Sequence, residues 1–175
     1  MNSKEKIQLH KGMDCVRRMD FEKAIEYFQI VTASNPDMPE AWNNLGVAFY
    51  GLGRIDEALE SYDRSIALDP SNLDALRNRA FLLRNQKRLP EALETYDTVL
   101  EKGGDAMDLE STAVVLTAMG RLEEALNCLY LAREKLSLKR LEDEIEMVQK
   151  KILERDGQSG DKAKCEPDGR EERKE

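Results

Sequence analysis

The sequence predicts an all-α solenoid, built from about four helix-turn-helix units and a C-terminal capping helix. Three sets of equivalent residues support this fold class, because their members follow one another at intervals of 34, 34 and 33 residues. The first set consists of the small residues Gly12, Gly46, Ala80 and Ala113. The other sets are Ala24, Ala58, Ala92 and Ala125, and Phe28, Tyr62, Tyr96 and Leu129. A constant period of this length is the signature of stacked repeats, in which each unit covers the apolar face of its neighbour.

Each repeat is predicted to contain two helices, A and B, because its apolar residues recur at intervals of three and four. In the second unit, one face of helix A carries Trp42, Leu45 and Phe49. One face of helix B carries Ala58, Tyr62 and Ile66. The four predicted units therefore span about residues 5–38, 39–72, 73–105 and 106–137.

The small and special residues of the second unit have separate roles in this interpretation. Gly46 and Ala58 are predicted to lie where the two helices cross, because a close crossing leaves no room for larger side chains. Gly53 is expected to end helix A in a left-handed conformation. Pro70 is expected to end helix B, because the residue before a proline, here Asp69, avoids helical geometry.

These residues resemble the signature of the tetratricopeptide repeat family. The matching positions are Trp42, Leu45, Gly46, Phe49, Ala58, Tyr62 and Pro70. The first unit departs from the signature, with Gln8 and Lys11 in place of the tryptophan and the leucine. The resemblance implies a right-handed superhelix whose concave wall is made mainly by the A helices. It also implies that the protein binds other proteins.

The C-terminal part is predicted to form one more helix, over about residues 138–155. Its apolar residues alternate by three and four: Leu138, Leu141, Ile145, Val148 and Ile152. Such a helix would cover the exposed side of the last repeat, although a short intermolecular coiled coil would use the same stripe. From residue 156 to residue 175 no apolar periodicity remains, so a disordered polar tail is expected after a repeat domain of residues 1–155.

Composition excludes several classes of function. The formal net charge is −8, which disfavours binding to nucleic acids. No apolar run is long enough to span a membrane and the polar start lacks a secretion signal, so a cytoplasmic protein is expected. The three cysteines form no CxxC pair, so no metal site is predicted. His10 is the only histidine, no phosphate-binding loop is present, and neither catalytic residues nor a cofactor are predicted.

The candidate binding residues are exposed positions of the A helices in the second and third units. They are Asn43, Asn44, Val47, Tyr50, Arg77, Asn78, Phe81 and Arg84. Asn44 and Asn78 are equivalent, and an amide side chain offers the donor and the acceptor that hold a peptide bond. Asparagine is, however, also common on solvated helix faces. A parallel apolar line consists of Met13, Val47, Phe81 and Val114, which would either contact a ligand or pack between neighbouring A helices.

Arg77 and Arg84 lie seven residues apart and would receive an acidic group of a ligand. The alternative for these arginines is an ion pair with Asp74 or another nearby acid. Chaperone-tail receptors of the resembled family clamp a terminal carboxylate with lysine, asparagine and arginine, and only Asn44 matches that cluster here. Binding to chaperone tails is therefore not expected.

The sequence predicts a non-catalytic protein–protein interaction module, or scaffold, that holds a peptide segment of a partner protein in its concave groove. The alternative function is structural self-assembly, in which the C-terminal helix or the first unit docks on a second copy. A monomer is expected under the first interpretation and a homodimer under the second.

Overall fold

The computed structural model describes residues 3–135 and 139–162, and all regular secondary structure in these residues is helical. The helices are α1 (Ser3–Arg17), α2 (Phe21–Ser34), α3 (Pro39–Gly51), α4 (Ile55–Leu68), α5 (Leu73–Asn85), α6 (Leu89–Glu101), α7 (Ala106–Ala118), α8 (Leu122–Lys135) and α9 (Lys139–Lys162). In the part of the chain so described, no helix combines the length and the apolar character needed to cross a membrane.

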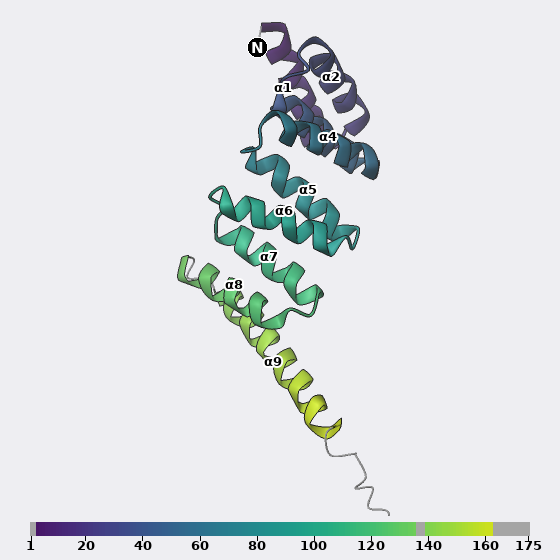
Figure 1. Cartoon of the computed structure of the whole chain (residues 1–175). Coiled ribbons are helices and arrows are strands. Elements are labelled where there is room, and N and C mark those ends of the chain that lie inside the picture. The colour runs from purple at the N-terminus through teal and green to yellow at the C-terminus, as the bar shows by residue number, and fades with distance from the viewer. Residues whose placement is uncertain (1–2, 136–138, 163–175) are drawn as a thin grey trace, which may run out of the picture.

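The helices form consecutive pairs that stack along one axis, as Figure 1 shows. Odd-numbered helices α1, α3, α5 and α7 are the A helices, and each packs against the B helix that follows it. The buried residues fall into two clusters, one over the first two pairs and one over the last two pairs with α9. Leu59 contacts both clusters, so the apolar core runs along the array. The predicted fold class, an all-α solenoid of helix-turn-helix repeats, is confirmed.

The small residues lie where the helices of a pair approach each other most closely. A Cβ atom added to Gly46 would lie 2.6 Å from Cε1 of Tyr62, which is buried on the facing helix α4. A Cβ atom added to Gly12 would meet Phe28 in the same way, at 2.5 Å. Ala58 is fully buried in this crossing. The predicted role of Gly46 is therefore confirmed, because only glycine leaves space for the aromatic ring.

The turn between the helices of each pair repeats one backbone geometry. Its left-handed residue has a φ of 60° in Met19, 72° in Gly53, 61° in Lys87 and 77° in Gly120. The next residue donates its N–H to a carbonyl of helix A, for example Arg54 N to Phe49 O at 2.9 Å. The left-handed end predicted at Gly53 is confirmed, and two units adopt it without glycine.

The end of α4 also follows the prediction. The helix stops at Leu68, and Asp69 has an extended backbone with a φ of −137° and a ψ of 93°. Asp69 then accepts hydrogen bonds from the backbone N–H and the hydroxyl of Ser71, at 2.9 and 2.6 Å. This turn leads the chain from one repeat into the next.

Helix α9 covers the end of the last pair. Leu141, Ile145 and Val148 are buried in the same cluster as Leu129 of α8. The helix continues to Lys162, so the predicted end at residue 155 was wrong. Each added helical residue costs little once a helix exists, and Arg155 ties this region to α8 through an ion pair with Glu123 at 2.6 Å. Residues 163–175 of the tail predicted over residues 156–175, and the junction of α8 and α9 at residues 136–138, lie outside the described residues.

Candidate interaction groove

The candidate site is the face formed by the A helices, where three hollows follow one another along the array. The first, of about 790 Å³, lies between α1, α3 and α5. The second, of about 330 Å³, lies between α5 and α7, and the third, of about 340 Å³, lies between α7 and α9. We call this succession of hollows the A-helix groove. A long, shallow surface of this kind suits an elongated ligand better than a small molecule.

Large apolar side chains are exposed along the A-helix groove. Met13 lines the first hollow, Phe81 the second and Val114 the third, with exposed fractions of 37, 40 and 46%. Val47, their equivalent on α3, is half-buried and packs against the core cluster of the first two pairs. The alternative interpretation, packing between helices, therefore describes Val47, whereas the other three side chains remain accessible.

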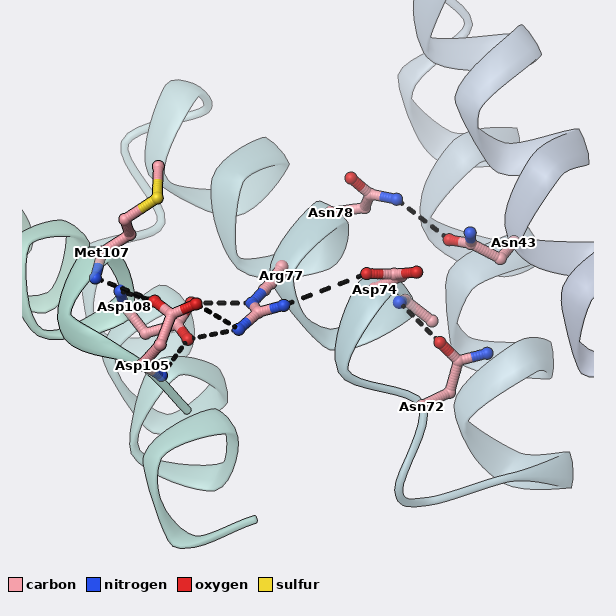
Figure 2. A network of polar contacts seen from close by, with 9 residues as sticks. Asn43, Asn72, Asp74, Arg77, Asn78, Asp105, Met107 and Asp108 are labelled. Atoms are coloured by element: carbon pink, nitrogen blue, oxygen red, sulfur yellow. Dashed lines mark hydrogen bonds and ion pairs between the residues drawn. The ribbon is translucent and has the colours of Figure 1, made fainter. Parts of the chain in front are cut away.

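The two equivalent asparagines have different surroundings. The Nδ2 of Asn44 donates to the carbonyl oxygen of Glu40 in its own helix, at 2.8 Å. The Nδ2 of Asn78 donates to Oδ1 of Asn43 at 3.0 Å, and Figure 2 shows this contact joining α5 to α3. Among the described residues no donor reaches the Oδ1 of either Asn44 or Asn78. Both side chains therefore keep an acceptor and one N–H for a ligand.

The guanidinium group of Arg77 is held by acidic side chains of the same chain. Its Nε and Nη2 donate to the two carboxylate oxygens of Asp108, at 2.8 and 2.6 Å, and its Nη2 also lies 3.3 Å from Asp105. Asp74 lies 4.0 Å from its Nη1, and Figure 2 shows the arginine between these acids. The side chain therefore forms the ion pairs that were the alternative for Arg77, and contact with an acidic group of a ligand stays a prediction.

Asp108 is the centre of this polar network. Burial raises the pKa of its carboxyl, but the hydrogen bonds from Arg77 and Asp105 and the charge of Arg77 outweigh this effect, so its pKa lies below the ordinary value. The carboxylate also accepts a bond from the backbone N–H of Asp105 at 2.8 Å, which closes a capping box at the start of α7. Asp108 was not among the predicted residues, although the sequence carries a signal: its equivalents in the two preceding units are Ala41 and Ala75.

The remaining predicted residues form an aromatic group on α3 and α5. The rings of Tyr50 and Phe81 meet edge to face, with centroids 5.9 Å apart at 83°. The guanidinium of Arg84 lies 5.0 Å from the centre of the Phe81 ring. The Nδ2 of Asn85 donates to the hydroxyl of Tyr50 at 3.2 Å. Within the described residues no carboxylate pairs with Arg84, so its charge remains accessible.

The first hollow is acidic, which the sequence analysis did not predict. Four carboxylates line it: Asp37, Glu40, Asp69 and Asp74. Four amides line it as well: Asn35, Asn43, Asn44 and Asn72. Several of these residues come from the loops before α3 and α5, whereas the predicted site was confined to helices. No lysine or arginine belongs to the lining.

Other candidates for chemistry are isolated. His10 is exposed on α1. Cys15 and Cys128 are half-buried free thiols, and burial raises the pKa of Cys128. In residues 3–135 and 139–162, no group of three or more histidine, cysteine or acidic side chains is arranged to hold a metal ion.

Stacked helix pairs with an open face define the class of helical repeat proteins. The family model of the tetratricopeptide repeat matches residues 11–72 and 48–106, which together span more than half of the chain. The chain therefore belongs to the tetratricopeptide repeat family, and the resemblance found in the sequence is confirmed.

Two curated proteins are similar over part of the chain. An uncharacterized protein of Methanocaldococcus jannaschii is 39% identical over 56 residues, which cover 32% of this chain and 65% of that protein. The peroxisomal targeting signal receptor of Eremothecium gossypii is 35% identical over 60 residues, 34% of this chain and 10% of the receptor. The chain thus spans less than two thirds of the first relative and a tenth of the second.

Solved structures share the fold over most of the chain. MamA from Desulfovibrio magneticus RS-1 superposes with a TM-score of 0.79 at 19% identity, over 94% of both chains. TTC0263, a thermophilic protein of Thermus thermophilus, has a TM-score of 0.69 at 16% identity, over 84% of this chain and 82% of its own. The first repeat domain of Spaghetti, solved with a bound HSP90 peptide, has a TM-score of 0.65 at 20% identity, over 69% of this chain and 96% of its own. At such identities the likeness concerns the fold alone.

Proposed function

We propose that the protein is a non-catalytic interaction module that holds a segment of a partner protein in the A-helix groove. The observation that carries this proposal is the line of exposed apolar side chains Met13, Phe81 and Val114, one in each hollow. Exposed large apolar residues arranged along one surface are typical of a binding site. The peptide bound by the Spaghetti domain is an instance of a ligand on the same fold.

Polar side chains beside this line would orient the segment. Asn44 and Asn78 each keep an acceptor and an N–H, which suits the peptide bonds of an extended chain. Arg84, whose guanidinium lies over the Phe81 ring, would add a charge contact. Arg77 lines the second hollow, where Asp74, Asp105 and Asp108 surround its guanidinium group. The cytoplasmic location stays a prediction.

Self-assembly through the C-terminal helix has less support. Leu141, Ile145 and Val148 are already buried against the same chain, so their stripe does not offer a surface to a second copy. Of the other described side chains of α9, Glu142 and Gln149 pair with Arg133 and Tyr130 of α8, and Asp143 and Glu146 are exposed and charged. Its exposed large apolar side chains are Met147 and Leu153, which do not form a continuous stripe.

Self-assembly through the first unit is also poorly supported. Its outward positions are Lys4, Ile7, Lys11, Asp14 and Arg18, of which only Ile7 is apolar. The equivalent positions of the second unit are Met38, Ala41, Leu45, Ala48 and Leu52, which pack in the core. Charged side chains on a stacking face are costly to desolvate, so this end suits contact with water.

The experiment compares two matched double variants by capture of proteins from a lysate of the source cells. The groove variant Phe81→Ser with Val114→Ser removes two exposed apolar side chains of the A-helix groove. The control Ile30→Ser with Leu131→Ser removes two side chains of the B helices that are 52 and 51% exposed and occupy equivalent positions. We expect the wild type and the control to retain the same proteins and the groove variant to lose them.

Circular dichroism should give the same helix content for both variants, because all four side chains are substantially exposed. A groove variant that retains every partner, or a control that loses them equally, would refute the assignment of binding to the A-helix groove.

A further inference from the structure

The A-helix groove extends beyond the four repeats onto α9. Met13, Val47, Phe81, Val114 and Met147 follow one another at intervals of 34, 34, 33 and 33 residues. Met147 lies on α9, is 51% exposed, and lines the third hollow together with Val114. Helix α9 therefore occupies the place of a fifth A helix: its buried face caps the array, and its neighbouring face continues the apolar line.

The third hollow is the more apolar end of the groove. Ala113, Val114, Ala118 and Met147 contribute to its lining, and its volume is about 340 Å³. Its charged members, Glu144 and Lys151, are of opposite sign, so they bring no net charge. This end suits a bulky apolar side chain of a ligand, because burying it beside Val114 and Met147 removes apolar surface of both partners from water.

The opposite end has a different chemistry. The first hollow is lined by carboxylates and has no basic member. Asp37 and Glu40 form no ion pair with any described residue, and the nearest cation of Asp74 is Arg77, at 4.0 Å. Arg77 is itself held by Asp108, at 2.6 Å. Uncompensated negative charge in a recess attracts cations and repels acidic chains.

We propose that the partner segment carries lysine or arginine where it meets α1, α3 and α5, and a bulky apolar side chain where it meets α7 and α9. This inference rests on the proposed function and adds the chemistry of its ligand. Two observations support it independently: the charge of the first hollow, and the continuation of the apolar line onto Met147. An acidic segment fits neither end. The chain's own residues 163–175 contain no large apolar side chain and fit the third hollow poorly.

The experiment selects ligands from a library of random peptides displayed on phage, using the full-length protein at low ionic strength. We expect the retained peptides to be enriched both in lysine and arginine and in leucine, isoleucine, methionine and phenylalanine. Their affinity should fall as salt is added, because surface charge interactions are screened.

Two variants assign the features of the selected peptides to the two ends. Glu40→Gln with Asp74→Asn should weaken basic peptides about fivefold, because exposed charge pairs contribute modestly. Its control, Asp143→Asn with Glu146→Gln, makes the same chemical changes at exposed positions of α9 that do not line the third hollow, and should leave the affinity unchanged. Met147→Ser should abolish the apolar preference, whereas Leu153→Ser should not, because Leu153 is 72% exposed on α9 and does not line the third hollow.

The outcomes separate this inference from the proposed function. Retained peptides that lose binding in the Phe81→Ser, Val114→Ser variant but show no excess of basic residues would overturn the inference alone. An unchanged affinity in the Glu40→Gln, Asp74→Asn variant would overturn it as well. If no retained peptide depends on Phe81 and Val114, the proposed function fails and the inference fails with it. Light scattering that shows a mass increasing with concentration would identify a second copy of the chain as the occupant, against the proposal.

Discussion

Replacing Asp108 with alanine should destabilise the fold more than replacing any exposed acidic residue. The carboxylate is nearly buried, with a side chain that is 5% exposed, and it accepts two hydrogen bonds from Arg77 and one from the backbone of Asp105. A hydrogen bond to a charged group contributes about 1.5–3 kcal/mol to stability, and a helix cap contributes about 1 kcal/mol. Arg77 keeps Asp105 as a partner after the change, which reduces the loss.

The free energy of unfolding should therefore fall by about 2–4 kcal/mol. Urea denaturation followed by circular dichroism measures this change, and at a slope of about 2 kcal/mol per molar the midpoint should fall by roughly 1–2 M. The control is Asp143→Ala, an exposed acid of α9, whose effect should stay within about 0.5 kcal/mol. Equal midpoints for the two variants would refute the claim that Asp108 holds α5 to α7.

The same residue predicts a pH dependence. The folded pKa of Asp108 is depressed, so its ionised form contributes stability above the unfolded pKa of about 3.9, and the contribution is lost as the pH falls through the folded pKa. The difference in stability between the wild type and Asp108→Asn should be constant near neutral pH and should narrow in acid below about pH 4. A difference that persists in strong acid would show that packing, not charge, is responsible.

Three further substitutions test the repeat geometry by urea denaturation. Gly46→Ala should lower the free energy of unfolding by about 1–2 kcal/mol, because the added methyl group would lie 2.6 Å from the buried Tyr62 ring. This overpacking outweighs the better helix propensity of alanine. An increase in stability would contradict the close crossing. Lys87→Gly should raise the free energy of unfolding by about 0.5 kcal/mol. Lys87 has a φ of 61°, a conformation that costs a non-glycine residue about 1 kcal/mol or more. The greater flexibility of glycine in the unfolded chain offsets part of this gain. The reverse change at the equivalent position, Gly53→Ala, should destabilise, and a reversed sign for either variant would contradict the cost assigned to the left-handed turn.

Much of the fold follows from residues that act within one repeat. Gly46 faces Tyr62, Gly53 ends a helix and Pro70 limits another, and each effect operates over a few residues or between two helices joined by a short turn. The left-handed conformations of Met19 and Lys87 were also within reach, because both are equivalent to Gly53 in the period. Methionine and lysine give no local sequence signal for a left-handed turn, because glycine is the residue that is typical of that conformation.

The candidate site was predicted less completely. Equivalence correctly placed Met13, Phe81 and Val114 on one accessible face, but it also grouped Val47 with them, and Val47 is half-buried. The periodic pattern gives the side of the helix on which a residue lies. It does not give the depth of the groove at that residue, which depends on the neighbouring side chains.

The sequence by itself determined the repeat, its period, the two helices of each unit and the helix face on which the apolar line lies, because these depend on spacing within one unit. Only the tertiary structure decided that Arg77 is held by Asp108, 31 residues away, and that loop carboxylates help to make the first hollow acidic. Those relations join different units, and they depend on the distance and rotation between stacked pairs. The packing of many side chains sets that geometry, and no interval in the sequence encodes it directly.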